Sequence, residues 1–170
     1  MKTYIVTEGI SDRLLLEKLF SKNKNIEFMD CSSYSSAIST ATSILGKHQH
    51  RVVLVVDADS SSEEAIKERY DFIDYMLGSK SIHKDEYKIA LFAPQLESIF
   101  FEDKDMAEQI IGHSLSTEEY ITGKFKPREI LKSQLSKIGN NLTDSIIEKL
   151  RELPKIKEIN SFISESYAFA

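Results

Sequence analysis

The feature that most constrains the fold is an unbroken apolar run, residues 52–56, that stops abruptly at Asp57-Ala58-Asp59. A short run of β-branched and aliphatic residues bounded in this way indicates a buried strand. The end of that strand would present two carboxylates. A second candidate strand, residues 4–7, ends similarly, with Glu8 and Gly9. The sequence therefore predicts two strands that each carry acidic side chains to their ends.

Short aliphatic runs alternate with helical patterns as far as Phe92, an arrangement that favours a parallel α/β sheet. The expected strands are residues 4–7, 26–29, 52–56 and 87–92. Apolar residues recur at helical spacing between them, in residues 15–20, 37–45 and 66–77. Gly46 and Gly78 stand where the last two of these helices should end.

Beyond Asp103 only helical patterns remain, interrupted by Gly139 and Pro154. The apolar stripes are Leu131-Leu135-Ile138, Ile146-Leu150-Leu153 and Ile156-Ile159-Ile163. No proline-rich or glycine-rich linker precedes them. We therefore expect an α/β domain in residues 1–103 and a helical extension in residues 104–170, packed on it as one compact unit.

Composition places limits on function. A chain of 170 residues with 41% hydrophobic and 29% charged residues is typical of a globular domain. The single cysteine, Cys31, excludes an internal disulfide, and no apolar run is long enough to span a membrane. With no signal-like N-terminus, we expect a cytoplasmic protein. The net charge of −5 would repel nucleic acid, so binding DNA or RNA would need a basic patch, a bound metal or a partner.

The topology should bring the acids together. If the chain moves outward from the first strand to the second and crosses back to the third, the strand order is 2-1-3-4 with right-handed crossovers. Glu8 and Asp57 then lie side by side at the switch point, where open α/β sheets bind ligands. Carboxylates held this close repel one another, and a hard divalent cation relieves the repulsion. The pattern predicts a Mg²⁺ or Mn²⁺ site.

The segment Thr7-Glu8-Gly9-Ile10-Ser11-Asp12, followed by a helix and then by the strand that ends at Asp57-Ala58-Asp59, resembles the Toprim domain of topoisomerases, bacterial primases and several nucleases. The resemblance covers the N-terminal α/β part of the chain. It implies a catalytic metal surrounded by Glu8, Asp57 and Asp59. A topoisomerase would need a tyrosine on a separate domain and a replicative primase a zinc module, so a nuclease or a subunit serving a partner remains.

The form EGxSD is particularly similar to small primase-like proteins and to nucleases of the overcoming-lysogenization-defect (OLD) type. That similarity implies a further metal ligand at Asp12. A carboxylate just after the fourth strand, as in Ala93-Pro94-Gln95-Leu96-Glu97, resembles the extra ligand of the nuclease branch and adds Glu97. The resemblance also implies a nucleic-acid substrate, DNA ahead of RNA, an ATPase partner and a role in phage defence.

Several acids and bases have structural interpretations. Asp12 could simply favour a helix N-terminus, with Ser11 as the N-cap. The spacings of Ser61 to Glu64 and of Ser116 to Glu119 predict capping boxes. The basic segments 22–24 and 47–51 should lie at the edge of the sheet opposite the acids.

A further basic segment contains Lys124, Lys126 and Arg128 beside Phe125. It could fold over the crevice as a phosphate clamp, although a solvated helix start is the favoured interpretation.

Two other functions compete with a nuclease. Asp57-x-Asp59-x-Ser61 imitates the motif of a haloacid-dehalogenase-like phosphatase, with Asp57 as nucleophile and Asp59 as acid. That family usually carries the motif on the first strand, whereas here it follows the third. The non-enzymatic alternative is a binding or regulatory subunit of a larger nucleic-acid-processing or defence complex, whose acidic edge takes up metal weakly.

Overall fold

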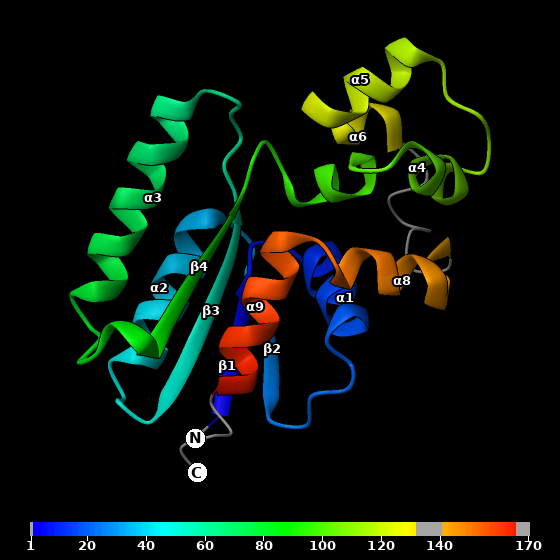
Figure 1. Cartoon of the computed structure of the whole chain (residues 1–170). Coiled ribbons are helices and arrows are strands. Elements are labelled where there is room, and N and C mark those ends of the chain that lie inside the picture. The colour runs from blue at the N-terminus through cyan, green and yellow to red at the C-terminus, as the bar shows by residue number, and fades with distance from the viewer. Residues whose placement is uncertain (1, 132–140, 166–170) are drawn as a thin grey trace.

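The computed structural model describes residues 2–131 and 141–165. Its centre is a sheet of four parallel strands in the order β2-β1-β3-β4 (Figure 1). The strands are β1 (Lys2–Thr7), β2 (Ile26–Asp30), β3 (His50–Asp57) and β4 (Tyr87–Phe92). The predicted α/β fold and strand order are confirmed. Because the chain crosses back after β2, β1 and β3 become neighbours, and Thr7 pairs with Val55.

Helices cover both faces of the sheet. Alternate side chains of a strand point to opposite faces. Leu54 and Val56 therefore meet α2 (Tyr34–Leu45) and α3 (Glu63–Gly78), while Val53 and Val55 meet α1 (Ile10–Leu19) and α9 (Pro154–Glu165) (Figure 1). No helix in the described ranges is long and apolar enough to cross a membrane. The helices are α1 (Ile10–Leu19), α2 (Tyr34–Leu45), α3 (Glu63–Gly78), α4 (Lys104–Ile111), α5 (Thr117–Phe125), α6 (Pro127–Leu131), α8 (Asp144–Arg151) and α9 (Pro154–Glu165), with short 3-10 helices η1 (Lys84–Glu86) and η2 (Leu96–Phe101).

Some predicted helix ends are correct and others are wrong. The capping box of Ser116 and Glu119 is present, and Gly46 caps α2. The N-cap of α3 is Ser62 rather than Ser61, because it is the Ser62 hydroxyl that accepts the Ala65 N–H, so no Ser61–Glu64 box forms.

The N-cap of α1 is Gly9 rather than Ser11, since extended backbone at Gly9 lets the helix begin immediately. Asp12 does lie in the first turn of α1, as predicted. Most of the predicted stripe from Leu131 to Ile138, and Gly139, fall outside the described residues.

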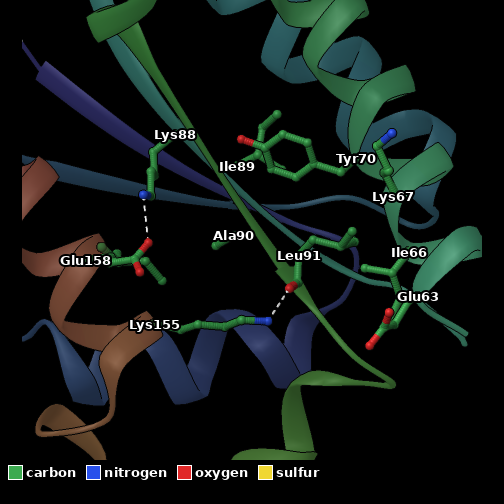
Figure 2. Close-up of a pocket in the computed structure, with 11 residues that line it drawn as sticks. Glu63, Ile66, Lys67, Tyr70, Lys88, Ile89, Ala90, Leu91, Lys155 and Glu158 are labelled. Atoms are coloured by element: carbon green, nitrogen blue, oxygen red, sulfur yellow. Dashed lines mark hydrogen bonds and ion pairs between the residues drawn. The ribbon is translucent and has the colours of Figure 1, made fainter. Parts of the chain in front are cut away.

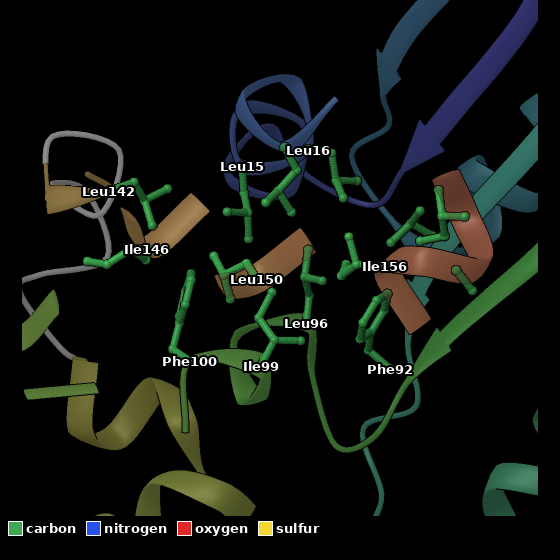
Figure 3. Packing of buried hydrophobic residues seen from close by; sticks show 14 of the residues in the cluster. Leu15, Leu16, Phe92, Leu96, Ile99, Phe100, Leu142, Ile146, Leu150 and Ile156 are labelled. Carbon is green, nitrogen blue, oxygen red and sulfur yellow. The ribbon is translucent and has the colours of Figure 1, made fainter. Parts of the chain in front are cut away.

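One hydrophobic cluster joins the sheet to the later helices (Figure 3). Leu15 and Leu16 of α1 meet Ile146 and Leu150 of α8, and Leu96, Ile99 and Phe100 of η2 belong to the same cluster. The segment that follows β4 is therefore held by apolar contacts on several sides. This matters for the site, because η2 also carries Glu97.

Helix α5 packs closely on η2 at Gly123. A Cβ added at this position would lie 2.0 Å from a ring carbon of Phe101, which is fully buried. Only a residue without a side chain allows the two segments to approach this far. The contact sets the position of α6, which follows α5 after one residue.

We expect Gly123→Ala to lower the free energy of unfolding by about 1–3 kcal/mol, because the added methyl group must displace a buried ring. Urea denaturation followed by circular dichroism measures the change. Ile121→Ala, at an exposed position of the same helix, is the matched control. Equal stability of Gly123→Ala and the wild type would contradict the close packing of α5 on η2.

Candidate functional site

The carboxyl ends of β1 and β3 meet at one edge of the sheet. Glu8, directly after β1, accepts a hydrogen bond from the backbone N–H of Asp57 through Oε1 at 2.9 Å. Asp57 is the last residue of β3. The structure therefore brings these two predicted site residues together, and one of them fixes the backbone of the other.

Both carboxylate oxygens of Asp57 are engaged in a buried position. Oδ1 accepts the Leu96 N–H at 2.8 Å, and Oδ2 pairs with Nη2 of Arg128 at 2.8 Å. Arg128 Nε also donates to Oε1 of Glu97 at 2.9 Å, so one guanidinium bridges the two acids. Asp57 and Glu97 are each only 5% exposed. The loop after β4 thus places Glu97 beside Asp57, as the sequence predicted for a shared site.

The second oxygen of Glu97 is the most informative atom of this cluster. Oε2 is buried, and it has no hydrogen-bond partner among the residues that the structure describes. A buried carboxylate oxygen without a partner is costly, so such an atom in a native site calls for a bound water or ion. The oxygen is therefore available to a water molecule or to a cation.

Asp12 approaches the same cluster from the first turn of α1. Burial raises the pKa of Asp12 to about 6, and the negative charge of Glu97 acts in the same direction. Burial also raises the pKa of Asp57 to about 7, with the charges of Glu97 and Asp12 adding to the shift. The pKa of Glu8 is raised for the same main reason, burial. These carboxylates lie close enough to resist simultaneous ionisation.

Asp59 faces a different arginine. Its backbone is left-handed, with φ of 50°, and its N–H donates to the Pro94 carbonyl at 2.8 Å. The carboxylate lies 3.5 Å from Nη2 of Arg69 on α3. Arg69 also donates to the Ala58 carbonyl at 2.8 Å and lies over the ring of Tyr34, 4.1 Å from its centroid. Asp59 and Glu8 are still close enough for the charge of Asp59 to raise the pKa of Glu8.

The site thus contains two acid–arginine groups that meet at Glu8. One consists of Asp57, Glu97 and Arg128, with Asp12 nearby, and the other of Asp59 and Arg69. As they lie, no three His, Cys, Asp or Glu side chains in the described ranges are gathered around one point that could hold a metal ion. The hard oxygen donors and the unpartnered oxygen of Glu97 nevertheless suit Mg²⁺ or Mn²⁺, provided that Arg128 moves off the two acids it bridges.

Arg128 lies in the first turn of α6 with its side chain 45% exposed, as the favoured interpretation of a solvated helix start expects, but it also pairs with two buried acids. Its guanidinium contacts Asp57 and Glu97 because Pro127 is buried and α6 packs on η2. The sequence offered the basic segment that could fold over the acids and the need of those acids for a countercharge, but it did not identify which cation of the segment supplies it. The basic segments 22–24 and 47–51 do lie at the amino ends of β2 and β3, opposite the acids, as predicted.

Pockets lie along the edge strand β4 and beside the segment that follows it. A pocket of about 480 Å³ lies along β4 between α3 and α9, where Lys155 donates to the Leu91 carbonyl at 2.6 Å and Lys88 pairs with Glu158 (Figure 2). Lysines on an edge strand commonly protect it from pairing with another chain. The second pocket, about 260 Å³, adjoins the acids and is lined by Asp59, Pro94, Gln95, Phe125, Lys126, Arg128 and Glu129.

Comparison with known proteins adds no assignment to this geometry. The chain matches no protein-family model, no curated protein and no solved structure. The chemistry of the site therefore has to be inferred from its own residues.

The raised pKa values of Asp12 and Asp57 predict a specific pH dependence. Between the ordinary value of 3.8 and the raised values of about 6 and about 7, the folded state holds more protons than the unfolded state. The free energy of unfolding should therefore fall as pH rises through this window. We expect Asp57→Asn to reduce that fall, measured by urea denaturation in chelator from about pH 5 to about pH 8. Asp71→Asn is the control for the loss of an exposed carboxylate. If the free energy of unfolding of Asp57→Asn falls with pH as steeply as that of the wild type, the raised pKa of Asp57 is contradicted.

Removing Arg128 tests its role as the countercharge. We expect Arg128→Ala to lower the free energy of unfolding in chelator near neutral pH by about 1–3 kcal/mol, because two buried carboxylates lose their ionised donor. Arg128→Lys keeps a positive charge and should lose less. Chemical denaturation measures both variants. Wild-type stability of Arg128→Ala would show that the guanidinium does not stabilise the acids.

Proposed function

We propose that the chain is a Mg²⁺- or Mn²⁺-dependent enzyme that cuts phosphodiester bonds in nucleic acid, with DNA as the first substrate to test and RNA as the second. The observation that carries the proposal is the convergence of Glu8, Asp57 and Glu97 from three segments on one sheet edge, with a buried Glu97 oxygen that has no partner. A site rich in oxygen donors at the carboxyl ends of parallel strands is where such a fold binds ligands.

Each acid has a role in this proposal. Asp57 and Glu97, with Asp12 nearby, would hold one ion, and Asp59 with Glu8 would hold a second. Bound there, the metal would polarise the phosphodiester and activate water. Glu8 accepts the Asp57 N–H, and burial raises its pKa, so we assign it the role of the group that exchanges a proton with the reacting oxygen.

Arg128 would bind the phosphate of the substrate. When the acids have no other cation, Nη2 of Arg128 lies 2.8 Å from Oδ2 of Asp57, and Nε lies 2.9 Å from Oε1 of Glu97. If a metal ion takes over the neutralisation of both acids, the guanidinium is released at the mouth of the same crevice. A guanidinium fork binds phosphate oxygens in a bidentate manner, so the released side chain can orient the substrate.

The negative net charge of the chain suggests that it needs bound cations or a partner protein to bind nucleic acid. The net charge is −5, and the crevice itself concentrates acids, so a polyanion is repelled until cations bind. A larger partner, such as the ATPase implied by the resemblance to OLD-type nucleases, would supply the positive surface for DNA. A role in phage defence is the setting that this resemblance implies.

One observation favours the alternative of a non-catalytic binding or regulatory subunit. Arg128 already neutralises Asp57 and Glu97, an arrangement that is satisfied without metal apart from one Glu97 oxygen. The phosphatase alternative gains no such support. Its nucleophile would be Asp57, whose two oxygens are both engaged and which is buried.

A nuclease assay separates these functions. We expect cleavage of plasmid or single-stranded DNA in Mn²⁺ or Mg²⁺, and a loss of about 100-fold or more in Glu8→Gln and Asp57→Asn, because each removes a group that acts in the transition state. Asp71→Asn should keep wild-type activity. Gel electrophoresis of the products, with RNA as a parallel substrate, provides the measurement.

Cleavage that persists in both Glu8→Gln and Asp57→Asn would refute the active-site assignment. No cleavage by any protein, together with no thermal shift on addition of metal, would favour the binding-subunit alternative. Hydrolysis of a small phosphomonoester that depends on Asp57 but not on Glu8 would favour the phosphatase.

A further inference from the structure

The pocket beside the acids combines groups that no metal site requires. It is about 260 Å³ and opens where the segment after β4 faces the junction of α5 and α6. Asp59 and Arg128 belong to both the pocket and the acid–arginine groups, so a molecule bound in the pocket would touch the carboxylate crevice. The two sites are therefore adjoining parts of one surface.

Phe125 gives this pocket an aromatic wall. It is the last residue of α5, and 58% of it is exposed, although α5 is held to η2 through Gly123. The ring of Pro94 lines the same pocket. Exposed aromatic rings occur singly on many surfaces, but this one lines a pocket together with Pro94. Such a wall suits a planar ring as ligand, because aromatic faces stack on one another.

The remaining lining residues include two carboxylates, Asp59 and Glu129, and three groups that can recognise a nucleotide, Gln95, Lys126 and Arg128. The Gln95 amide can both donate and accept hydrogen bonds. Lys126 and Arg128 supply positive charge on the side of the acids. An aromatic ring flanked by cations is how proteins commonly bind single-stranded nucleic acid, with bases stacked on the ring and phosphates at the cations.

We propose that this pocket binds one nucleotide of a single-stranded nucleic acid, with its base stacked on Phe125 and its phosphate at Lys126 and Arg128. The inference rests on the proposed function, since it names the form of substrate that the carboxylate crevice receives. A base inside a duplex is stacked on its neighbours and cannot reach the ring, so the pocket selects strands whose bases are free.

The present partners of the two cations explain why binding should depend on metal. Lys126 pairs with Glu129 at 3.1 Å, and Arg128 with Asp57 and Glu97. The first pair is largely exposed, so its net strength is small and a phosphate can replace Glu129. The second is partly buried, and Arg128 turns to a phosphate only when another cation neutralises its acids. Single strands should therefore bind more tightly in the presence of a divalent ion than in chelator.

The test measures fluorescence anisotropy of a labelled oligothymidylate in Ca²⁺, with the integrity of the probe checked on a gel. We expect Phe125→Ala to weaken binding of the single strand by about 5- to 100-fold, the loss of one stacked base. Phe125→Trp should keep the affinity. Phe72→Ala is the matched control, because Phe72 is 51% exposed on α3, outside the pocket. Thermal denaturation verifies that each variant is folded.

Mn²⁺ titration of the same proteins separates this inference from the proposed function. Metal binding that is unchanged in Phe125→Ala, with single-strand affinity lost, supports both. Metal binding with wild-type single-strand affinity in Phe125→Ala overturns the nucleotide pocket alone. If the wild type binds no Mn²⁺ and Phe125→Ala still loses single-strand affinity, the metal site and the metal dependence of binding are overturned, and stacking on Phe125 stands. No binding of the single strand by the wild type, or equal loss of duplex binding in Phe125→Ala, also overturns the pocket.

Discussion

Repulsion among carboxylates gathered at one sheet edge is the constraint on which the rest of the site depends. A parallel sheet sends the ends of β1 and β3 to the same place, and α1 and η2 add two more acids. Two arginines pair with these acids, Arg69 on α3 and Arg128 on α6. Burial and the charges of neighbouring acids raise the pKa values of Glu8, Asp12 and Asp57, and the two cations offset these effects only in part.

The apolar core makes that concentration of charge tolerable. The same cluster that joins α1, α8 and α9 to the sheet also holds η2, so Glu97 cannot retreat from Asp57. Helix α5 is tied to η2 through Gly123, which in turn positions α6. The energy that holds the acids together therefore comes from buried hydrophobic surface some distance from the acids themselves.

How far the sequence predicts this structure depends on the kind of residue. The strands and their order follow from apolar runs, and the meeting of Glu8 with Asp57 follows from that order. Arg128 could not be found in this way, because its contact depends on the packing of two short helices that no periodicity specifies.

The same limit applies to Asp59, whose left-handed backbone turns its carboxylate toward Arg69. A sequence predicts which residues form a strand and which residues end it. It does not predict which side chains from distant loops pair with one another. Fold and strand-end acids thus belong to the predictable part, and the countercharges do not.

The position of Arg128 along the chain also bears on how the protein can be divided. Asp57 and Arg128 are separated by 71 residues, and the boundary expected near residue 103 falls between them. During synthesis the acids of the sheet would be in place before their countercharge emerges from the ribosome. A fragment cut at that boundary would keep the whole sheet but lack the cation for two buried carboxylates. The helical segment is thus an electrostatic part of the α/β unit, and separating the two pieces would break one site rather than free two domains.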